Sequence, residues 1–169
     1  MAAEDGSRAS ADHGCGTRKA VTTYPVGTCF HEAGHAVVAA ALGLEVGDLH
    51  VNPDDESGGA QIGCPSHLSL IDQVAVCFAG MEAHLIWQGV PDHFAEAGDY
   101  ATFRGLELVK CLSDEDRDKL ETAGYERANE LLSKNGTVVV IVAHRLVQRG
   151  YLTAAEFKHL TRGLEPGPC

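Results

Sequence analysis

The chain has 169 residues, of which 44% are apolar, and a formal net charge of −11. This length is enough for one domain with a hydrophobic core, and the frequent Leu, Val and Ala residues favour a folded, helix-rich protein. The negative charge argues against nucleic acids and anionic membrane surfaces as partners, because their phosphates would be repelled.

The six cysteines are scattered along the chain, and no two of them form a C-x-x-C pair. This pattern indicates free thiols in a reducing compartment rather than a disulfide framework or a cysteine-rich zinc site. The chain does not begin with the basic and apolar stretches of a secretory signal, and its apolar runs are short and interrupted for a membrane span. We therefore expect a cytoplasmic protein without membrane contact.

Residues 1–22 are rich in Ala, Gly, Ser and charged residues and show no periodicity, which predicts a disordered tail. We expect a single domain at residues 23–163 and a flexible C-terminal tail at residues 164–169, which contain two prolines. The first predicted element of the domain is a helix at residues 28–42. Its second half is small and apolar, as in a buried helix, and Gly43 is a plausible stop.

Residues 31–35 of this predicted helix read His-Glu-Ala-Gly-His, a complete H-E-x-x-H motif. Residues four apart lie on one helix face, so His31 and His35 can offer two imidazole nitrogens to one metal ion. Glu32 lies about 100° around the helix from His31, where its carboxylate can reach a water molecule without binding the metal. This arrangement is typical of a zinc peptidase, which has two such ligands, a general base and an open position for water.

A small β-hairpin is predicted next, from a strand within residues 44–51, an acidic and turn-rich loop at residues 52–59, and a returning strand at residues 60–63. We interpret the acidic residues of the loop as an exposed polar surface rather than a calcium site. Zinc peptidases commonly hold an extended substrate against an edge strand through main-chain hydrogen bonds. The candidate residues for such a strand are Gly59, Ala60, Gln61 and Ile62.

The rest of the chain is predicted to be helical, which gives a mainly α protein with a small β-hairpin. A strong apolar stripe predicts a helix at residues 69–88, and a loop is expected at residues 92–98. Residues 137–149 have many β-branched side chains, but the length of the segment and the Arg-Gly at its end favour a helix. Further helices are predicted at residues 99–111, at residues 113–133, and from Thr153, which forms a capping box with Glu156.

A catalytic zinc ion needs a third protein ligand, which must come from a later part of the chain. We favour Asp99, because at the start of a predicted helix its carboxylate can point into a cleft and the helix dipole favours its ionised form. A simple helix N-cap is the alternative role for this residue. The candidates for the third ligand are Glu82, His84, Asp92, His93, Glu96 and Asp99.

Residues 30–39 read Phe-His-Glu-Ala-Gly-His-Ala-Val-Val-Ala, and they resemble the motif helix of the FtsH-type ATP-dependent zinc metalloproteases. Residues 78–89 are similar to that family's helix with glycine and alanine residues. Residues 98–102, Gly-Asp-Tyr-Ala-Thr, resemble its segment with an aspartate zinc ligand, and residues 135–160 resemble its final pair of helices. The resemblance covers about residues 24–163 and is strongest at the first motif.

This resemblance implies a zincin-like helical peptidase domain with one zinc ion, held by His31, His35 and Asp99, and with Glu32 as the base. The family usually has Glu where this chain has His84, which leaves Glu82 and His84 open as supporting residues behind the ligands or as alternative ligands. The family's ATPase module and membrane anchors have no counterpart in the sequence. We therefore expect the domain to stand alone, as a monomer or dimer rather than a hexamer.

The sequence thus predicts a zinc-dependent metalloendopeptidase that hydrolyses flexible or unfolded polypeptides, with Glu32 activating the attacking water. His93 is a further candidate for stabilising the oxyanion that develops on the substrate. The alternative hypothesis is a metal-binding interaction module of peptidase-like fold with weak or no catalysis. The intact Glu32 argues against this alternative, because a pure binding module has no need of a base.

Overall fold

The computed structural model describes residues 24–89 and 93–167 of the chain. The disordered tail predicted for residues 1–22 lies outside the described residues. The prediction of a mainly helical protein with a small antiparallel β component is confirmed. The elements in chain order are α1 (Val26–Ala41), β1 (Val46–Val51), β2 (Gly58–Ile62), α2 (Leu70–Gln88), α3 (His93–Gly105), α4 (Glu107–Lys110), α5 (Asp114–Lys134), α6 (Gly136–Arg149), β3 (Tyr151–Leu152) and α7 (Ala154–Leu160).

Local signals in the sequence explain where several helices begin and end. The side chains of Ser69, Ser113 and Thr153 each accept a hydrogen bond from a backbone N–H three residues later, which caps α2, α5 and α7. The cap of α7 is the full capping box that the sequence predicts. Gly89 and Gly150 adopt left-handed backbone conformations, with φ of 72° and 67°, and end α2 and α6.

The predicted hairpin is present as β1 and β2, but the sheet has a third strand that the sequence analysis missed. β1 is the central strand, where Leu49 lies opposite Ala60 of β2 and Leu152 of β3. The left-handed turn at Gly150 returns the chain to β1, and the Gly150 carbonyl accepts a 2.8 Å hydrogen bond from the Val51 N–H. The sequence does not reveal β3, because a strand of two residues is too short to show an alternating pattern. Since β1 is the central strand, β2 lies at one edge of the sheet.

The loop predicted for residues 92–98 is wrong from His93 onward, because α3 begins at that residue. The glycine directly before Asp99 suggested a break, but an isolated glycine is tolerated inside a helix. Asp99 is thus an interior residue of α3, and neither an N-cap role nor the helix dipole applies to it. The helix predicted at residues 99–111 is also interrupted, at Leu106, whose backbone is extended between α3 and α4.

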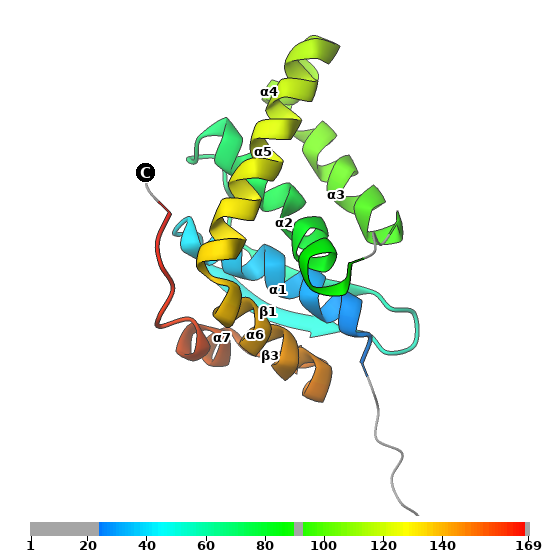
Figure 1. Ribbon diagram of the computed structural model, residues 1–169, viewed down its shortest axis with the longest axis vertical. Coiled ribbons are helices and arrows are strands. Elements are labelled where there is room, and N and C mark those ends of the chain that lie inside the picture. The colour runs from blue at the N-terminus through cyan, green and yellow to red at the C-terminus, as the bar shows by residue number, and fades with distance from the viewer. Residues whose placement is uncertain (1–23, 90–92, 168–169) are drawn as a thin grey trace, which may run out of the picture.

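α1 is the central element of the fold. Figure 1 shows it crossing the middle of the molecule, with α2 on one side and the sheet and α6 on the other. α1 and α2 approach so closely that a Cβ placed on Gly34 would lie 2.5 Å from both the Ala79 carbonyl oxygen and the Ala83 Cβ. Small residues at the contact therefore set the spacing of the two helices. The fully buried apolar residues of α1 are Cys29, Ala33, Ala36, Val37, Val38 and Ala39.

A second apolar cluster fixes α3 and α5 against α2. Phe78 of α2 is fully buried and stacks on Tyr125 of α5, with ring centroids 4.3 Å apart. Its ring also contacts Phe103 and Tyr100 of α3, at centroid distances of 5.1 and 5.3 Å. The Tyr100 hydroxyl lies 2.9 Å from that of Tyr125. This cluster holds α3 in the position that brings Asp99 to α1.

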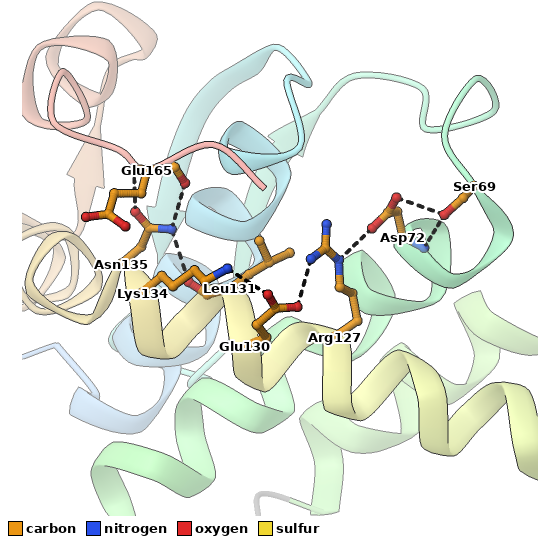
Figure 2. A network of polar contacts seen from close by, with 8 residues as sticks. All are labelled: Ser69, Asp72, Arg127, Glu130, Leu131, Lys134, Asn135 and Glu165. Atoms are coloured by element: carbon orange, nitrogen blue, oxygen red, sulfur yellow. Dashed lines mark hydrogen bonds and ion pairs between the residues drawn. The ribbon is translucent and has the colours of Figure 1, made fainter. Parts of the chain in front are cut away.

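Polar contacts along α5 join it to α2 and bind its own turns together. Figure 2 shows Arg127 between two carboxylates, with Nε 2.9 Å from Asp72 Oδ1 of α2 and Nη1 2.8 Å from Glu130 Oε2. Lys134 pairs with the other oxygen of Glu130, at 2.7 Å. The Arg127 and Asp72 side chains are mostly buried, so this pair is better shielded from water than an exposed ion pair.

The segment after α7, expected to be a flexible tail, forms hydrogen bonds to the body up to Gly167. The buried Asn135 side chain donates to the Glu165 carbonyl and accepts from the Glu165 N–H, at 3.2 and 2.9 Å (Figure 2). The Gly167 N–H donates to the Ala41 carbonyl at the end of α1, at 3.0 Å. These bonds place residues 164–167 beside the C-terminal end of α1.

α2 is long and apolar enough to cross a membrane by length and composition alone. The expectation that every apolar run is too short for a span is therefore wrong for this helix. Half of its apolar window is buried inside the protein, between α1 and α5, and the core helix of a soluble protein passes the same test. The absence of membrane contact and the cytoplasmic location stay predictions.

Replacing Phe78 by Ala should destabilise the protein by about 3–5 kcal/mol, because it leaves a cavity under three aromatic neighbours. The free energy of unfolding in urea, measured on the metal-free chain, tests this expectation. Leu108→Ala is the control, because Leu108 is 61% exposed and its loss should cost little. Equal stability losses in the two variants would contradict the importance of this cluster.

Candidate metal centre

Three side chains from two helices converge on one point. His31 and His35 lie one turn apart on α1, and their Nε2 atoms are 3.1 Å apart. Asp99 approaches from α3, with Oδ1 3.1 Å from His35 Nε2 and Oδ2 3.6 Å from His31 Nε2. One ligand atom of each residue lies within 4.8 Å of the other two, so the group can hold a metal ion. His31 and Asp99 are buried, and His35 is partly buried.

The hydrogen bonds around the group fit a cation at its centre. His35 Nδ1 lies 2.8 Å from the Val76 carbonyl of α2, to which it can only donate, and this bond leaves the Nε2 lone pair for a metal. Asp99 Oδ2 is buried and accepts no hydrogen bond from the described residues, and His31 Nε2 lies 3.6 Å from it. An unsatisfied buried carboxylate oxygen is costly, and a metal ion between Asp99 and the two imidazoles would satisfy it.

Gly80 of α2 forms the wall behind the two imidazoles. A Cβ at this position would lie 2.6 Å from His31 Nε2 and would contact His35 Nε2 even more closely. A methyl group would therefore occupy the space in which the nitrogens converge. The sequence analysis missed this residue, although an isolated glycine inside a strongly apolar helix is a signal of close approach.

Glu32 lies beside the three converging side chains but is not one of them. It is 7% exposed, and a Cβ placed on Gly58 would be 2.7 Å from Glu32 Oε1. The carboxylate thus faces the first residue of β2. Burial raises the pKa of Glu32, and the nearby charges of His35 and His31 act against this rise. A raised pKa suits a group that must accept and then release a proton near neutral pH.

Two cavities meet at this group, and Glu32, His35 and Asp99 line both. The larger has a volume of about 740 Å³ and extends along the loop before β2 to Gly58 and Gly59. The smaller has a volume of about 310 Å³ and extends along Ala60 and Ile62. The two cavities therefore follow edge strand β2 on either side of Glu32. Gly59, Ala60, Gln61 and Ile62, the candidates for a substrate-binding strand, all belong to β2.

The structure places the other candidate ligands away from the converging group or outside the described part. Glu82 accepts a 3.3 Å hydrogen bond from the Asn129 side chain of α5, so it faces a different neighbour. His84 is buried beside the start of α1, where a Cβ on Gly27 would lie 2.7 Å from its Cε1. The structure describes neither Asp92 nor the side chains of His93 and Glu96.

In the metal-free protein Asp99 and His35 form a charged pair. Burial lowers the pKa of His35, but the hydrogen bond to Asp99 and the charge of Asp99 outweigh burial and raise it from 6.5 to about 9. Burial likewise raises the pKa of Asp99, and its contacts with His31 and His35 reverse this effect and lower it. A metal ion bound by His35 would replace the proton on its ring.

No protein-family model matches the chain, and no curated protein matches it significantly. The interpretation of the site therefore depends on its own geometry.

Replacing Gly80 by Ala should weaken metal binding about tenfold or more, because the new methyl group must displace one or both imidazoles. Titration of the metal-free chain with Zn²⁺ or Co²⁺ measures the affinity. Gly105→Ala is the matched control, since a Cβ at that position of α3 meets no atom of the described residues within 4 Å. Unchanged affinity in the Gly80 variant would show that the imidazoles do not converge where the structure places them.

The stability of the metal-free protein should fall as the pH rises from about 6.5 to about 9. The folded-state pKa of His35, about 9, is above its ordinary value of 6.5, so its contribution is full below pH 6.5 and is lost as the pH approaches 9. The expected loss is on the order of 3 kcal/mol. Urea unfolding at several pH values, with a chelator present, measures it. Asp99→Asn should remove most of this dependence, and an equally steep curve in that variant would contradict the assignment.

Proposed function

We propose that this chain is a zinc-dependent endopeptidase of zincin-like fold, similar to the FtsH-type peptidases, that hydrolyses flexible or unfolded polypeptides. One observation carries the proposal: His31, His35 and Asp99 converge as a buried group, while Glu32 lies beside them at the junction of two cavities. A metal site with a purely structural role would be closed by a fourth protein ligand, and no described His, Cys, Asp or Glu completes the group.

The donor set favours zinc over the common alternatives. Two imidazole nitrogens and one carboxylate suit Zn²⁺, whereas Mg²⁺ and Ca²⁺ prefer sites made of oxygen ligands. Three protein ligands also leave a coordination position open to the cavities. A zinc ion held there would lower the pKa of a water molecule and polarise the carbonyl of a substrate.

The proton transfers fall to Glu32. Its carboxylate is near the converging ligand atoms, and its pKa is raised mainly by burial, which supports a role as general base. It would take the proton from the attacking water and deliver it to the amine of the leaving peptide. Because the carboxylate is outside the ligand group, it would keep both oxygens for this task.

β2 is suited to bind an extended substrate. It is an edge strand of the sheet, and both cavities lie along it. A peptide that pairs with such an edge forms main-chain hydrogen bonds that do not depend on its sequence. The scissile bond must also reach a buried group, so a folded domain would be excluded and a flexible chain accepted.

Replacing Glu32 by Gln should leave one zinc ion per chain and reduce the cleavage of unfolded casein at least about 100-fold, because the amide cannot accept the proton. Elemental analysis gives the zinc content, and gel or mass-spectrometric analysis of the casein gives the rate. Glu82→Gln makes the same chemical change at a residue that faces Asn129, and it should leave cleavage nearly unchanged.

Asp99→Ala is the complementary control, which should lose zinc and activity together. Full casein cleavage by the Glu32 variant would contradict its role as the base. Stoichiometric zinc without any cleavage by the unmodified chain would favour the metal-binding interaction module instead.

A further inference from the structure

We propose that Glu121 of α5, acting through the Tyr100 hydroxyl, positions the carboxylate of the candidate metal ligand Asp99. Tyr100 follows Asp99 in α3, and its hydroxyl donates a 2.7 Å hydrogen bond to Glu121 Oε1. Glu121 lies outside the group that can hold a metal ion, so its role is that of a positioning residue. The inference rests on the metal site of the proposed function, and it adds the contact that fixes one ligand of that site.

The packing of α3 alone does not fix its rotation. Among the described elements, α3 packs extensively only on α2 and on the short α4 that follows it. The contact with α2 is aromatic, and the rings of Phe103 and Tyr100 lie 5.1 and 5.3 Å from that of Phe78. The hydrophobic attraction between such rings is non-directional, so it holds α3 against α2 at more than one rotation. Gly98 inside α3 also lowers the intrinsic stability of this helix.

A small rotation of α3 would displace the Asp99 carboxylate. A helical side chain ends roughly 5–6 Å from the helix axis, so a rotation of about 10° moves its end by about 1 Å. Metal–ligand distances vary by only about 0.2 Å. Because Asp99 and Tyr100 are consecutive, the same rotation would move the Tyr100 hydroxyl away from Glu121. The hydrogen bond to α5 therefore opposes the motion that would most disturb the metal site.

The Tyr100 hydroxyl is held by two residues of α5. It donates to Glu121, and it accepts a 2.9 Å hydrogen bond from the Tyr125 hydroxyl. Glu121 and Tyr125 are four residues apart, so they lie on one face of α5. Burial and the hydrogen bond to Tyr100 raise the pKa of Tyr125, which keeps its phenol protonated as the donor. Consecutive hydrogen bonds that end on a carboxylate strengthen one another.

α5 is a firm anchor for this bond because it is closely tied to α2. Arg127 of α5 pairs with Asp72 of α2 at 2.9 Å (Figure 2). A Cβ placed on Gly124 of α5 would lie 2.9 Å from the Cβ of Val74. α2 also supplies Gly80, which lies behind the two imidazoles of the site. The bond to α5 therefore fixes α3, and with it the Asp99 carboxylate, relative to the other two ligands.

Titration of the metal-free chain with Zn²⁺, in competition with a chelating dye, tests the inference without cleavage. Glu121→Ala and Tyr100→Phe remove the bond from opposite ends, and each should lower the affinity about three- to tenfold. Tyr100→Phe keeps the ring on Phe78, so it tests the bond even if the other variant does not fold. Glu121→Gln should retain the affinity, because its amide oxygen can still accept from Tyr100. The matched control is Glu126→Ala, which removes an exposed carboxylate from the same helix and should change nothing.

The same change in the Asp99→Ala chain separates positioning from a general loosening of the fold. That chain keeps the two imidazoles, and titration at high Co²⁺ concentration measures its weak residual binding. If Glu121 acts through Asp99, Glu121→Ala should cause no further loss of Co²⁺ affinity in this chain. An equal fold-loss with and without Asp99 would overturn the inference, as would unchanged Zn²⁺ affinity in both Glu121→Ala and Tyr100→Phe.

The two proposals can fail separately. Zinc affinity that depends on Glu121 through Asp99, in a chain that does not cleave casein, would support the positioning role and refute the peptidase. Casein cleavage by the unmodified chain, with full zinc affinity in both Glu121→Ala and Tyr100→Phe, would support the peptidase and refute the positioning role.

Discussion

The close contact between α1 and α2 is the constraint on which the candidate site depends. α2 supplies three features to one side of α1: the Val76 carbonyl that orients His35, Ala79 against Gly34, and Gly80 behind both imidazoles. These positions recur at helical spacing, so they form one face of α2. Any larger residue on this face would separate the helices, and the carbonyl and the imidazoles would move apart together. The contacts between α1 and α2 therefore determine both the packing of the core and the geometry of the candidate metal ligands.

The position of the Asp99 carboxylate depends on a different contact, the packing of α3 on α2. Phe78 stacks on Tyr125 and also contacts α3 through Phe103 and Tyr100, the residue next to Asp99. Burying a carboxylate is costly, and in this protein two imidazoles offset that cost, as does any cation they bind. The aromatic cluster supplies the apolar contacts that hold the charged group in place.

The parts of the fold that the sequence predicted are those with strong local signals. Once residues 31–35 are helical, the spacing of the H-E-x-x-H motif places its two histidines on one face with the glutamate beside them. The capping box at Thr153 is equally local. β3 and the true start of α3 were missed, because a two-residue strand exists only through its pairing with β1 and a glycine before Asp99 resembles a helix start. Asp99 was favoured because it was predicted to start a helix, and the structure contradicts this reason. It converges with the histidines from inside α3. Gly80 and the Val76 carbonyl depend on the contact between two helices, which no single segment reveals.

Charge links the composition of the chain to the chemistry of the cleft. A net charge of −11 predicts only that strongly acidic partners are repelled, wherever they approach. The structure distributes this charge unevenly. On α5, Asp114, Glu115 and Glu130 pair with a lysine or arginine. Asp54, Asp55 and Glu56, which line the larger cavity, form no ion pair with another described residue. At physiological salt, an exposed charge acts over about 8 Å. The carboxylates of Asp54, Asp55 and Glu56 can therefore act mainly within the larger cavity that they line, whereas the distant charges act elsewhere on the surface. The electrostatics of this cavity thus depend on where these three residues lie, which the total charge of the chain does not reveal.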